Sequence, residues 1–522
     1  MRTLESYTCG RWTAGTSNPA SLHNATTGEA MATASSHGVD LGAAVRFARE
    51  RGGPALRAMT FAQRGELLRK MSDAIVTHRD ELLGLAMQNG GNTRSDAKFD
   101  VDGASGTLAA YADHCKTLGD GRFLVDGEPV SLGRSSRLSG QHVAVPRHGV
   151  AVQVNAFNFP AWGMAEKAAC SLAAGMPFLA KPATATALVA WRIMQVWVEQ
   201  GVLPEGVGQF IAGGAGDLLD HLGPQDVLAF TGSSDTAVKL RGHRRVLEKG
   251  VHVNVEADSL NVAVAGPDLQ RGTATYDLFI NNVVKEMTQK AGQKCTAIRR
   301  VFVSADGLES VREDLLDRLS TQKVGDPQRD DVTVGPLATA QQKRDVLAGM
   351  QKLMKNAKVI LGGPDKLELL GADPAKGYFV MPTLLEAPEA DRADEVHAHE
   401  VFGPLATLLV YRDAAHAAAL AARGEGGLVA SVYSDDKAFS TEVFLGLAPH
   451  HGRVCVGSEK VAGQFIPPGT VMPMLVHGGP GRAGGGEELG GTRGMMLYTQ
   501  RTAVQAFGPW LEALAAMGKR VG

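Results

Sequence analysis

Hydrophobic positions recur along this chain with two alternating periods, and each period predicts a different element. Spacings of three and four residues predict helices at Asp40–Arg51, Thr60–Thr77, His78–Asn89, Asp100–Lys116 and Ala161–Ala174. Short apolar runs bounded by turn residues predict strands at Val150–Val154, Phe178–Ala180, Val207–Ile211, Val227–Phe230 and Val251–Val255. Because strand and helix alternate, we expect right-handed crossovers and a mostly parallel α/β fold.

The pattern divides the chain into two α/β domains with additional segments. We predict a dinucleotide-binding domain from residues 1–130 and 150–256, and a second domain from residues 257–475. Gln141–Val154 alternates in the manner of a hairpin, and Tyr498–Phe507 has the pattern of a late strand. Either segment extends to pair with another subunit or forms an ordinary edge hairpin.

Composition mainly excludes classes of protein. The 522 residues suffice for two or three domains, and a net charge of −2 gives no electrostatic reason to expect nucleic acid or an anionic membrane as partner. No apolar run reaches membrane-spanning length, and the first residues lack a secretory pattern. The five cysteines are scattered without a Cys-x-x-Cys pair, which is typical of reduced thiols in a cytoplasm.

Cys295 lies in the segment Lys-Ala-Gly-Gln-Lys-Cys-Thr-Ala-Ile-Arg-Arg, residues 290–300. Gly292 frees the backbone before the thiol, and the small Thr296 and Ala297 leave one side of it open. A thiolate that attacks a carbonyl carbon needs this access. Because a lone cysteine is more often an inert core residue, the prediction of a nucleophile depends on what other segments supply.

Two polar residues at element junctions supply complementary chemistry. Asn158 lies between a predicted strand and a predicted helix, where its amide N–H can stabilise an oxyanion; the alternative is a helix N-cap. Glu256 ends the apolar run at Val251, Val253 and Val255, where a carboxylate can activate water to hydrolyse a thioester. The alternative for Glu256 is a solvent-facing acid at a strand terminus.

Other strand ends suit a nucleotide. Lys181 and Ser233 each follow a buried-type strand, at the carboxyl edge where doubly wound sheets hold ligands. Lys181 can reach a ribose or phosphate, and Ser233 with a helix starting near Asp235 can hold a pyrophosphate oxygen. The turn around Gly214 either faces the adenine or only reverses the chain. No Gly-x-Gly-x-x-Gly follows the first strand of the domain, so the ordinary Rossmann fingerprint is missing.

A later segment, Glu400-Val-Phe-Gly-Pro, offers an acid for ribose hydroxyls and an aromatic ring, Phe402, to pack near a nicotinamide. His397 and His399 lie just upstream and superficially suggest metal ligands. Because a third and a fourth ligand are not apparent, we expect no metal site.

The order Asn158, Lys181, Ser233, Glu256, Cys295, Glu400 and the words around these residues resemble the aldehyde dehydrogenase superfamily over nearly the whole chain. The resemblance implies a Rossmann-type cofactor domain, a catalytic domain at 257–475, and oligomerisation or bridging segments at 131–149 and 476–522 of a homo-oligomer. It implies Cys295 as nucleophile, Glu256 as general base, and Asn158 with the Cys295 N–H as oxyanion hole. The implied cofactor-binding residues are Phe157, Lys181, Thr184, Gly214, Thr231, Gly232, Ser233, Glu400 and Phe402.

Two more residues match family positions connected with proton transfer. Lys167 corresponds to a family lysine near the proton-relay path. Glu488 lies in Glu-Glu-Leu-Gly, which is similar to the family's Arg-Glu-Leu-Gly and makes it a second acid, although Glu487 replaces the arginine.

Departures from the family pattern give more specific expectations for the cofactor and the substrate. A glutamate that holds both adenine-ribose hydroxyls is common at the position of Thr184, and a threonine would accept a 2′-phosphate that a glutamate repels. NADP is therefore favoured over NAD. The words Asn-Phe-Pro-Ala-Trp-Gly and Glu-Ala-Asp-Ser-Leu-Asn resemble dehydrogenases of CoA-linked semialdehydes in benzoate and phenylacetate degradation. A CoA-linked aldehyde is thus the expected substrate.

Three questions stay open at this stage. A CoA-acylating dehydrogenase and a non-catalytic protein with the same fold are the rival functions, and Glu256 argues against the first. The Cys295 thiol needs help to ionise, which a helix N-terminus, the cofactor's positive ring or Lys167 can supply. The basic run Arg241, His243, Arg244, Arg245 and Lys249 either binds CoA phosphates or forms a solvated helix face.

Overall fold

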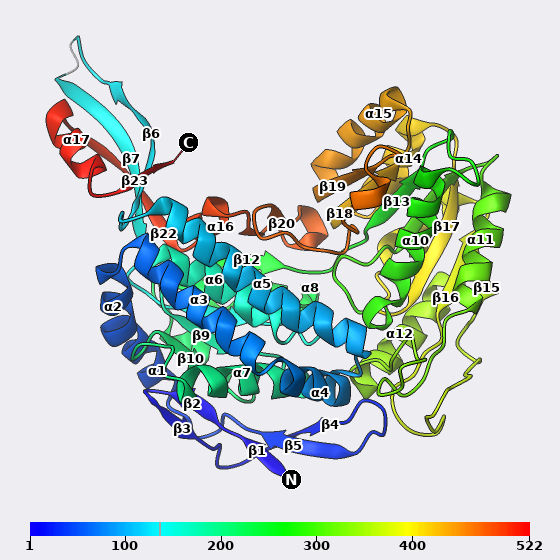
Figure 1. The fold of residues 1–522 in the computed structure, drawn as a ribbon, viewed down its shortest axis with the longest axis horizontal. Helices are drawn as coiled ribbons and strands as arrows, with labels where there is room; N and C mark the ends of the chain where they lie inside the picture. The colour runs from blue at the N-terminus through cyan, green and yellow to red at the C-terminus, as the bar shows by residue number, and fades with distance from the viewer. Residues whose placement is uncertain (135–136, 522) are drawn as a thin grey trace.

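A mostly parallel sheet gives the first half of the molecule its frame in the computed structural model, which describes residues 1–134 and 137–521 (Figure 1). Its seven described strands run in the order β12-β11-β8-β9-β10-β2-β3. They are β2 (Ser6–Thr8), β3 (Arg11–Thr13), β8 (Ala151–Val154), β9 (Phe178–Lys181), β10 (Gly208–Phe210), β11 (Val227–Thr231) and β12 (His252–Glu256). All pairs are parallel from β12 to β10, so the carboxyl ends of β8, β9, β11 and β12 meet at one edge.

Long helices cover this sheet, and their ends follow from the sequence. Thr60 and Gln63 form a capping box that starts one helix, and the side chain of Thr93 caps another. Gly175, with φ +96°, ends the buried helix that begins at Trp162. The helices of this half are α1 (Leu41–Phe47), α2 (Gly53–Ala58), α3 (Phe61–Thr77), α4 (Arg79–Gly90), α5 (Arg94–Leu118), α6 (Trp162–Ala174), α7 (Ala187–Glu199), α8 (Ser234–Arg241) and α9 (Arg244–Lys249), with a π-helical turn η1 (Ala48–Gly52) after α1.

A second sheet carries the later half, in the order β15-β16-β17-β14-β13-β18-β19 for the residues described. Its strands are β13 (Val262–Ala265), β14 (Arg300–Ser304), β15 (Lys358–Leu361), β16 (Thr383–Ala387), β17 (Leu405–Tyr411), β18 (Gly427–Tyr433) and β19 (His451–Gly457). Its helices are α10 (Ala274–Thr288), α11 (Leu308–Ser320), α12 (Ala340–Leu353), α13 (Asp394–Ala398), α14 (Ala414–Ala422) and α15 (Lys437–Leu447). Apolar clusters on both faces of this sheet form its core.

An arm extends from the first half, at the upper left of Figure 1. It is a sheet in the order β22-β7-β6-β23, made of β6 (Leu124–Ser131), β7 (Leu138–Pro146), β22 (Thr499–Phe507) and β23 (Lys519–Val521), with helix α17 (Gly508–Ala515). The late strand expected at Tyr498–Phe507 is thus confirmed. The hairpin expected within Gln141–Val154 is wrong, because β7 pairs with β6 and β22 whereas β8 belongs to the first sheet.

The C-terminal segment returns between the two halves before it enters the arm. It forms β20 (Val476–Gly478), β21 (Glu487–Leu489) and α16 (Thr492–Met496). A small sheet at the N-terminus contains β1 (Arg2–Leu4), β4 (Ala20–His23) and β5 (Ala30–Ala34). Among residues 1–134 and 137–521, no helix combines the length and apolar character that crossing a bilayer requires. The domain boundaries at 130, 150, 256 and 475 stay a prediction.

Candidate active site

The carboxyl edge of the first sheet forms one wall of a large cleft, with a volume of about 850 Å³. The residues that end β9, β11 and β12, namely Lys181, Thr231 and Glu256, all line it. The opposite wall includes Glu400 and Phe402 from the loop before β17. Cys295 lies at the inner end, where the cleft meets a second, small cavity of about 40 Å³.

Backbone constraints fix the position of Cys295. Lys290 and Ala291 adopt φ values of 55° and 50°, which are uncommon for residues with a side chain. Gly292 follows with φ +68°, and a Cβ there would lie 2.1 Å from the carbonyl oxygen of Gly403. After this turn, the side-chain amide of Asn261 donates to the carbonyl oxygen of Cys295 at 2.8 Å. The glycine at 292 therefore allows the loop before Cys295 to pack closely against the loop that contains Gly403.

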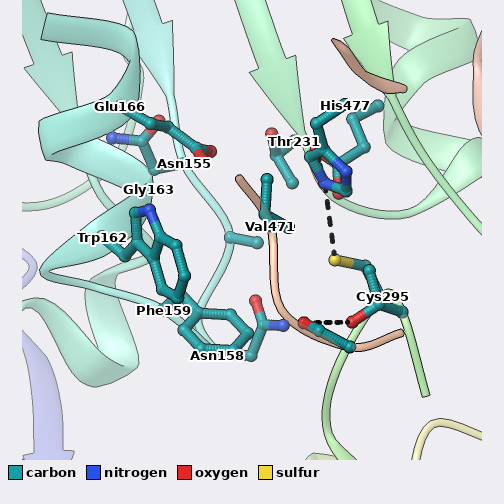
Figure 2. A pocket seen from close by; sticks show the side chains of 14 residues that line it. Asn155, Asn158, Phe159, Trp162, Gly163, Glu166, Thr231, Cys295, Val471 and His477 are labelled. Atoms are coloured by element: carbon teal, nitrogen blue, oxygen red, sulfur yellow. Dashed lines mark hydrogen bonds and ion pairs between the residues drawn. The ribbon is translucent and has the colours of Figure 1, made fainter. Parts of the chain in front are cut away.

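Three side chains from distant segments meet at the sulfur. The Cys295 Sγ lies 4.0 Å from Nε2 of His477 on β20 (Figure 2), and the same nitrogen lies 3.2 Å from Oε2 of Glu256. Both the His477 and Glu256 side chains are 4% exposed. The sequence alternative of a solvent-facing acid at Glu256 is therefore wrong, because the end of β12 is covered by the C-terminal segment.

Burial and neighbouring charge set the ionisation of this group. Burial, followed by the Glu256 carboxylate, raises the pKa of the Cys295 thiol well above its ordinary value. Burial also opposes ionisation of Glu256, but His477 and then Lys167 outweigh it and lower the pKa of Glu256 to about 2. Burial opposes the charged form of His477, yet Glu256 outweighs burial and raises the pKa of the imidazole. The carboxylate is thus ionised, and the thiol needs a base to lose its proton.

Asn158 lies in the loop between β8 and α6 and points toward the cavity that Cys295 lines (Figure 2). Its Nδ2 donates to the carbonyl oxygen of Gln293 at 3.0 Å, two residues before the thiol. The buried Asp100 carboxylate accepts from the N–H groups of Trp162 and Ala161, and so holds this loop at the start of α6. The alternative that Asn158 caps this helix is wrong, because α6 begins four residues later and has Ala161 as its N-cap.

A buried charge cluster lies behind Glu256. Lys167 Nζ donates to Thr231 Oγ1 at 2.7 Å and to Glu488 Oε2 at 3.0 Å, and lies 3.4 Å from Glu166 Oε1. Burial disfavours the Lys167 ammonium, but Glu488 and Glu166 raise its pKa. Burial raises the pKa of Glu166 to about 8 although Lys167 opposes the shift. Carboxylate oxygens of Glu166, Glu256 and Glu488 lie within 4.8 Å of one another, so Lys167 holds together acids that would otherwise repel.

Glu400 and Phe402, from the loop before β17, contact the buried guanidinium of Arg299. Glu400 accepts from the Ser259 N–H at 3.0 Å and from Arg299 Nη2 at 3.3 Å. Burial raises the pKa of Glu400 to about 7 despite Arg299. The Phe402 ring packs edge-on against Phe157 with ring centroids 5.8 Å apart. All three predicted residues, Phe157, Glu400 and Phe402, line the cleft.

The strand-end residues divide into two groups. The cleft is lined by Lys181, Thr231, Gly232 and Ser233. Ser233 is the N-cap of α8, and its side chain accepts a hydrogen bond from the Thr236 N–H. Burial lowers the pKa of Lys181. Within the described residues, Thr184 and Gly214 do not line this cleft. Thr184 Oγ1 donates to the Gly213 carbonyl oxygen at 3.0 Å, so these two predicted residues lie in adjoining loops.

Two sequence alternatives are resolved by contacts. Both ring nitrogens of His397 are engaged, with Arg300 and with the Ala390 carbonyl oxygen, and His399 pairs with Glu395. His397 is therefore held by hydrogen bonds inside the fold, and the absence of a metal site at these histidines stays a prediction. The basic run is largely a helix surface, as its members are mostly exposed or paired. Arg244 pairs with Glu248, Arg245 donates to the Leu222 carbonyl oxygen, and Arg241 donates to that of Gly484.

Sequence reasoning missed His477 and Glu166. His477 stands just before the glycine-rich segment at 478–491, which has no helical or strand period to mark an inward position. Glu166 directly precedes Lys167 on α6, and both side chains are buried. An acid next to a base on an otherwise apolar helix is the signal that indicates a buried ionic site.

Comparison with known proteins agrees with this geometry. The aldehyde dehydrogenase family model matches residues 12–504. The chain is 45% identical over 477 residues to the 3,4-dehydroadipyl-CoA semialdehyde dehydrogenase of Aromatoleum evansii, covering 91% of this chain and 93% of that protein. It is 26% identical to the succinate-semialdehyde dehydrogenase (NADP(+)) GabD of Escherichia coli (strain K12), covering 86% and 88% of the two chains.

Solved structures share the fold. Betaine aldehyde dehydrogenase of Staphylococcus aureus, in complex with NAD+, superposes with a TM-score of 0.83 at 22% identity and covers 96% of this chain and 94% of that one. The expected α/β architecture is confirmed by this likeness. Because the family model spans almost the entire sequence, and a relative of nearly half identity spans nine-tenths of it, the chain belongs to the aldehyde dehydrogenase family.

Proposed function

We propose that this aldehyde dehydrogenase oxidises a CoA-linked semialdehyde to a carboxylic acid with NADP, through a thiohemiacetal and then a thioester on Cys295. The observation that supports this most is the meeting of Cys295, Glu256 and Asn158 at the junction of a large cleft and a small cavity. A thiol, a carboxylate and a neutral amide donor are the groups that acyl transfer through a covalent intermediate requires.

The cleft fits a dinucleotide in size and in its polar groups. Its volume of about 850 Å³ lies within the range of cofactor sites. The N-terminus of α8 opens into it beside Ser233, which suits a pyrophosphate. Lys181 at the end of β9 and Glu400 on the opposite wall would hold ribose or phosphate groups. When bound, the nicotinamide supplies the hydride acceptor.

The side chains then divide the remaining work. The Cys295 sulfur forms a bond to the aldehyde carbon, and the Asn158 amide N–H stabilises the oxygen that gains negative charge. Loss of hydride leaves a thioester on Cys295. Glu256 takes a proton from water as its oxygen attacks the thioester carbon, and the C–S bond breaks to release the acid. Glu256 Oε1, which has no hydrogen-bond partner among the described residues, is the oxygen free to contact that water.

The choice of NADP rests on Thr184, where the chain has a hydroxyl in place of a carboxylate that would repel a 2′-phosphate. The choice of substrate rests on the relative from Aromatoleum evansii, whose name specifies 3,4-dehydroadipyl-CoA semialdehyde. The placement in aromatic-acid degradation, here the aerobic breakdown of benzoate, rests on the family resemblance of the sequence words quoted above. A homodimer or larger homo-oligomer built through the arm follows from the resemblance.

The decisive experiment follows NADP reduction with a panel of short aldehydes and CoA-linked semialdehydes. We expect kcat/KM to be highest for the CoA-linked compounds and the acid to be the product. Equal preference for simple aliphatic aldehydes would contradict the proposed substrate. Acyl-CoA formed in the presence of free CoA would instead show a CoA-acylating enzyme.

A variant pair tests the roles of the two reacting groups. Glu256→Gln should keep a single-turnover burst of NADPH and lose steady-state acid production, because only the second half of the reaction needs water activation. Cys295→Ala should abolish both. Unchanged steady-state turnover of Glu256→Gln would remove Glu256 from the mechanism.

A further inference from the structure

One point in the site brings together a thiol, a carboxylate and an imidazole. Nε2 of His477 lies 4.0 Å from the Cys295 sulfur and 3.2 Å from Oε2 of Glu256. The three residues can each offer one ligand atom so that all of these atoms lie within 4.8 Å of one another. The sulfur and the imidazole point toward each other in the small cavity (Figure 2). Thiolate sulfur, imidazole nitrogen and carboxylate oxygen are the three common protein ligands of zinc.

The separations of these atoms are close to those of a tetrahedral zinc site. Bonds of about 2.3 Å to sulfur and about 2.0 Å to nitrogen and oxygen place sulfur and nitrogen about 3.5 Å apart, and nitrogen and oxygen about 3.3 Å apart. The distance of 3.2 Å between His477 and Glu256 already agrees. The distance of 4.0 Å to the sulfur has to shorten by about 0.5 Å, which a small rotation of the Cys295 side chain supplies.

The site has both space and access for an ion. All three side chains line the small cavity of about 40 Å³, and a water molecule needs only about 10–15 Å³. A water can therefore complete the four ligands of the metal. Cys295 and Glu256 also line the large cleft, which gives the ion a route from solvent. The His477 and Glu256 side chains are 4% exposed, so protein surrounds most of the metal position.

A second set of acids nearby is less suited to a metal ion. Carboxylate oxygens of Glu166, Glu256 and Glu488 also lie within 4.8 Å of one another. Lys167 Nζ donates to Glu488 at 3.0 Å and lies 3.4 Å from Glu166, so a cation already occupies this set. The set that contains the sulfur is therefore the better metal site. Its thiolate and imidazole favour zinc over Mg²⁺ and Ca²⁺, which prefer oxygen ligands.

We propose that Cys295, Glu256 and His477 form a reversible zinc site that switches off the nucleophile. The S–H bond and the N–H bond at Nε2 break, both protons go to solvent, and the sulfur and nitrogen keep their electron pairs to bind Zn²⁺. Glu256 supplies the third ligand, and no group is oxidised or reduced. Because a sulfur bound to the metal cannot attack a carbonyl carbon, zinc and aldehyde exclude each other. This inference goes beyond the proposed function and does not depend on the aldehyde.

The exchange of protons for zinc leaves the charge of the buried site unchanged. Burial, followed by Glu256, raises the pKa of the Cys295 thiol, and Glu256 raises the pKa of His477 although burial opposes it. Both groups therefore hold protons at neutral pH, which the metal has to displace. A thiol, an imidazolium and a carboxylate have no net charge together. A thiolate, a neutral imidazole, a carboxylate and Zn²⁺ have none either, so the bound metal leaves no uncompensated buried charge.

The first test measures binding of Zn²⁺ to the full-length protein without NADP or aldehyde, by competition with a chromogenic chelator. We expect one zinc ion per chain in the wild type. His477→Gln keeps a hydrogen bond to Glu256 but offers a poor zinc ligand. Its zinc affinity should fall more than about 100-fold, because loss of a mere supporting hydrogen bond already costs about 10–100-fold.

The matched control is His416→Gln. His416 Nε2 also contacts a carboxylate, at 2.9 Å from Asp391, but it lies on α14, and none of the described residues that line the small cavity comes from that helix. We expect this variant to bind zinc as the wild type does. Equal losses in the two histidine variants would show adventitious binding.

Alkylation of Cys295 gives a readout that needs no variant, should His477→Gln fail to fold. Zinc should protect Cys295 of the wild-type protein from iodoacetamide, and EDTA should restore its reactivity. Peptide mass spectrometry distinguishes Cys295 from Cys9, which is also partly exposed and should react equally with and without zinc. Co²⁺ in place of zinc should give a sulfur-to-metal charge-transfer band.

Two results would overturn the proposal. One is alkylation of wild-type Cys295 at the same rate with and without zinc. The other is zinc binding by His477→Gln that is as tight as in the wild type. A protein that oxidises no aldehyde but shows zinc protection of Cys295 would contradict the proposed function and keep the zinc site. An active dehydrogenase without zinc protection would do the reverse.

Discussion

Lys167 and Glu488 form an ion pair of 3.0 Å between α6 and β21, with side chains 1% and 4% exposed. The pair joins residues 321 positions apart and lies directly behind Glu256, whose pKa Lys167 lowers. This ion pair therefore links the C-terminal segment to the first half of the molecule directly beside Glu256.

Breaking this pair from one side should be costly. We expect Lys167→Met and Glu488→Leu each to lower the free energy of unfolding by about 3–5 kcal/mol, because each leaves an uncompensated buried charge. The double variant should lose less than the sum, which urea denaturation measures. Lys70→Met, at an exposed position on α3, is the control and should change little. Additive losses would show that the two side chains do not interact.

Glu166 should make stability fall with rising pH. Its pKa is about 8 in the folded protein against an ordinary value of 4.5, so between these values the native state holds a proton that the unfolded chain releases. Its contribution therefore decreases across this window by up to about 1.4 kcal/mol per pH unit. Glu166→Gln should remove this slope, measured by urea unfolding from pH 5 to 8. The exposed Glu66→Gln is the control, and parallel curves for Glu166→Gln and wild type would contradict the assignment.

Gly292 should tolerate no side chain. Gly292→Ala places a Cβ 2.1 Å from the Gly403 carbonyl oxygen and also occupies a φ of +68°. Gly250 has φ +57° with open space around its Cβ position, so Gly250→Ala isolates the backbone strain, worth about 1–2 kcal/mol. We expect Gly292→Ala to cost clearly more in thermal unfolding and to slow NADPH formation. Equal losses in the two variants would show that the contact with Gly403 gives way easily.

Thr184 should control the choice of cofactor. Thr184→Glu introduces a carboxylate that repels a 2′-phosphate, and we expect NADPH affinity to fall at least about tenfold, or 1.4 kcal/mol, with NADH affinity retained. Fluorescence titration of both nucleotides measures the two dissociation constants. Thr184→Ser keeps the hydroxyl that donates to Gly213 and should behave as wild type. Equal weakening of both nucleotides would argue that this loop does not approach the 2′ position.

Strand ends were the most predictable part of the site. The apolar runs before Thr231 and Glu256 mark β11 and β12 almost to the residue, and parallel pairing then brings their ends together. The alternation of apolar and polar residues gave a wrong prediction where two strands follow each other closely in the sequence. β7 and β8 are separated by four residues but belong to different sheets, and alternation of side chains does not reveal the partner of a strand.

The position of His477 was not predictable for a related reason. Its strand has three residues, too few for a period, and its contact with Cys295 spans 182 positions. Such a residue is placed by the packing of the whole chain rather than by its neighbours. Glu256 was recognised from local pattern, but its ionisation depends on His477 and Lys167, which reach it from other elements.

The place of β20 and β21 late in the polypeptide has a consequence for biosynthesis. Translation delivers Asn158, Glu256 and Cys295 long before residues 477 and 488 emerge. Domains of a growing chain fold as they leave the ribosome, so both large sheets can form before His477 and Glu488 reach the site. The buried charge cluster behind Glu256 is therefore completed only when the end of the polypeptide has been made.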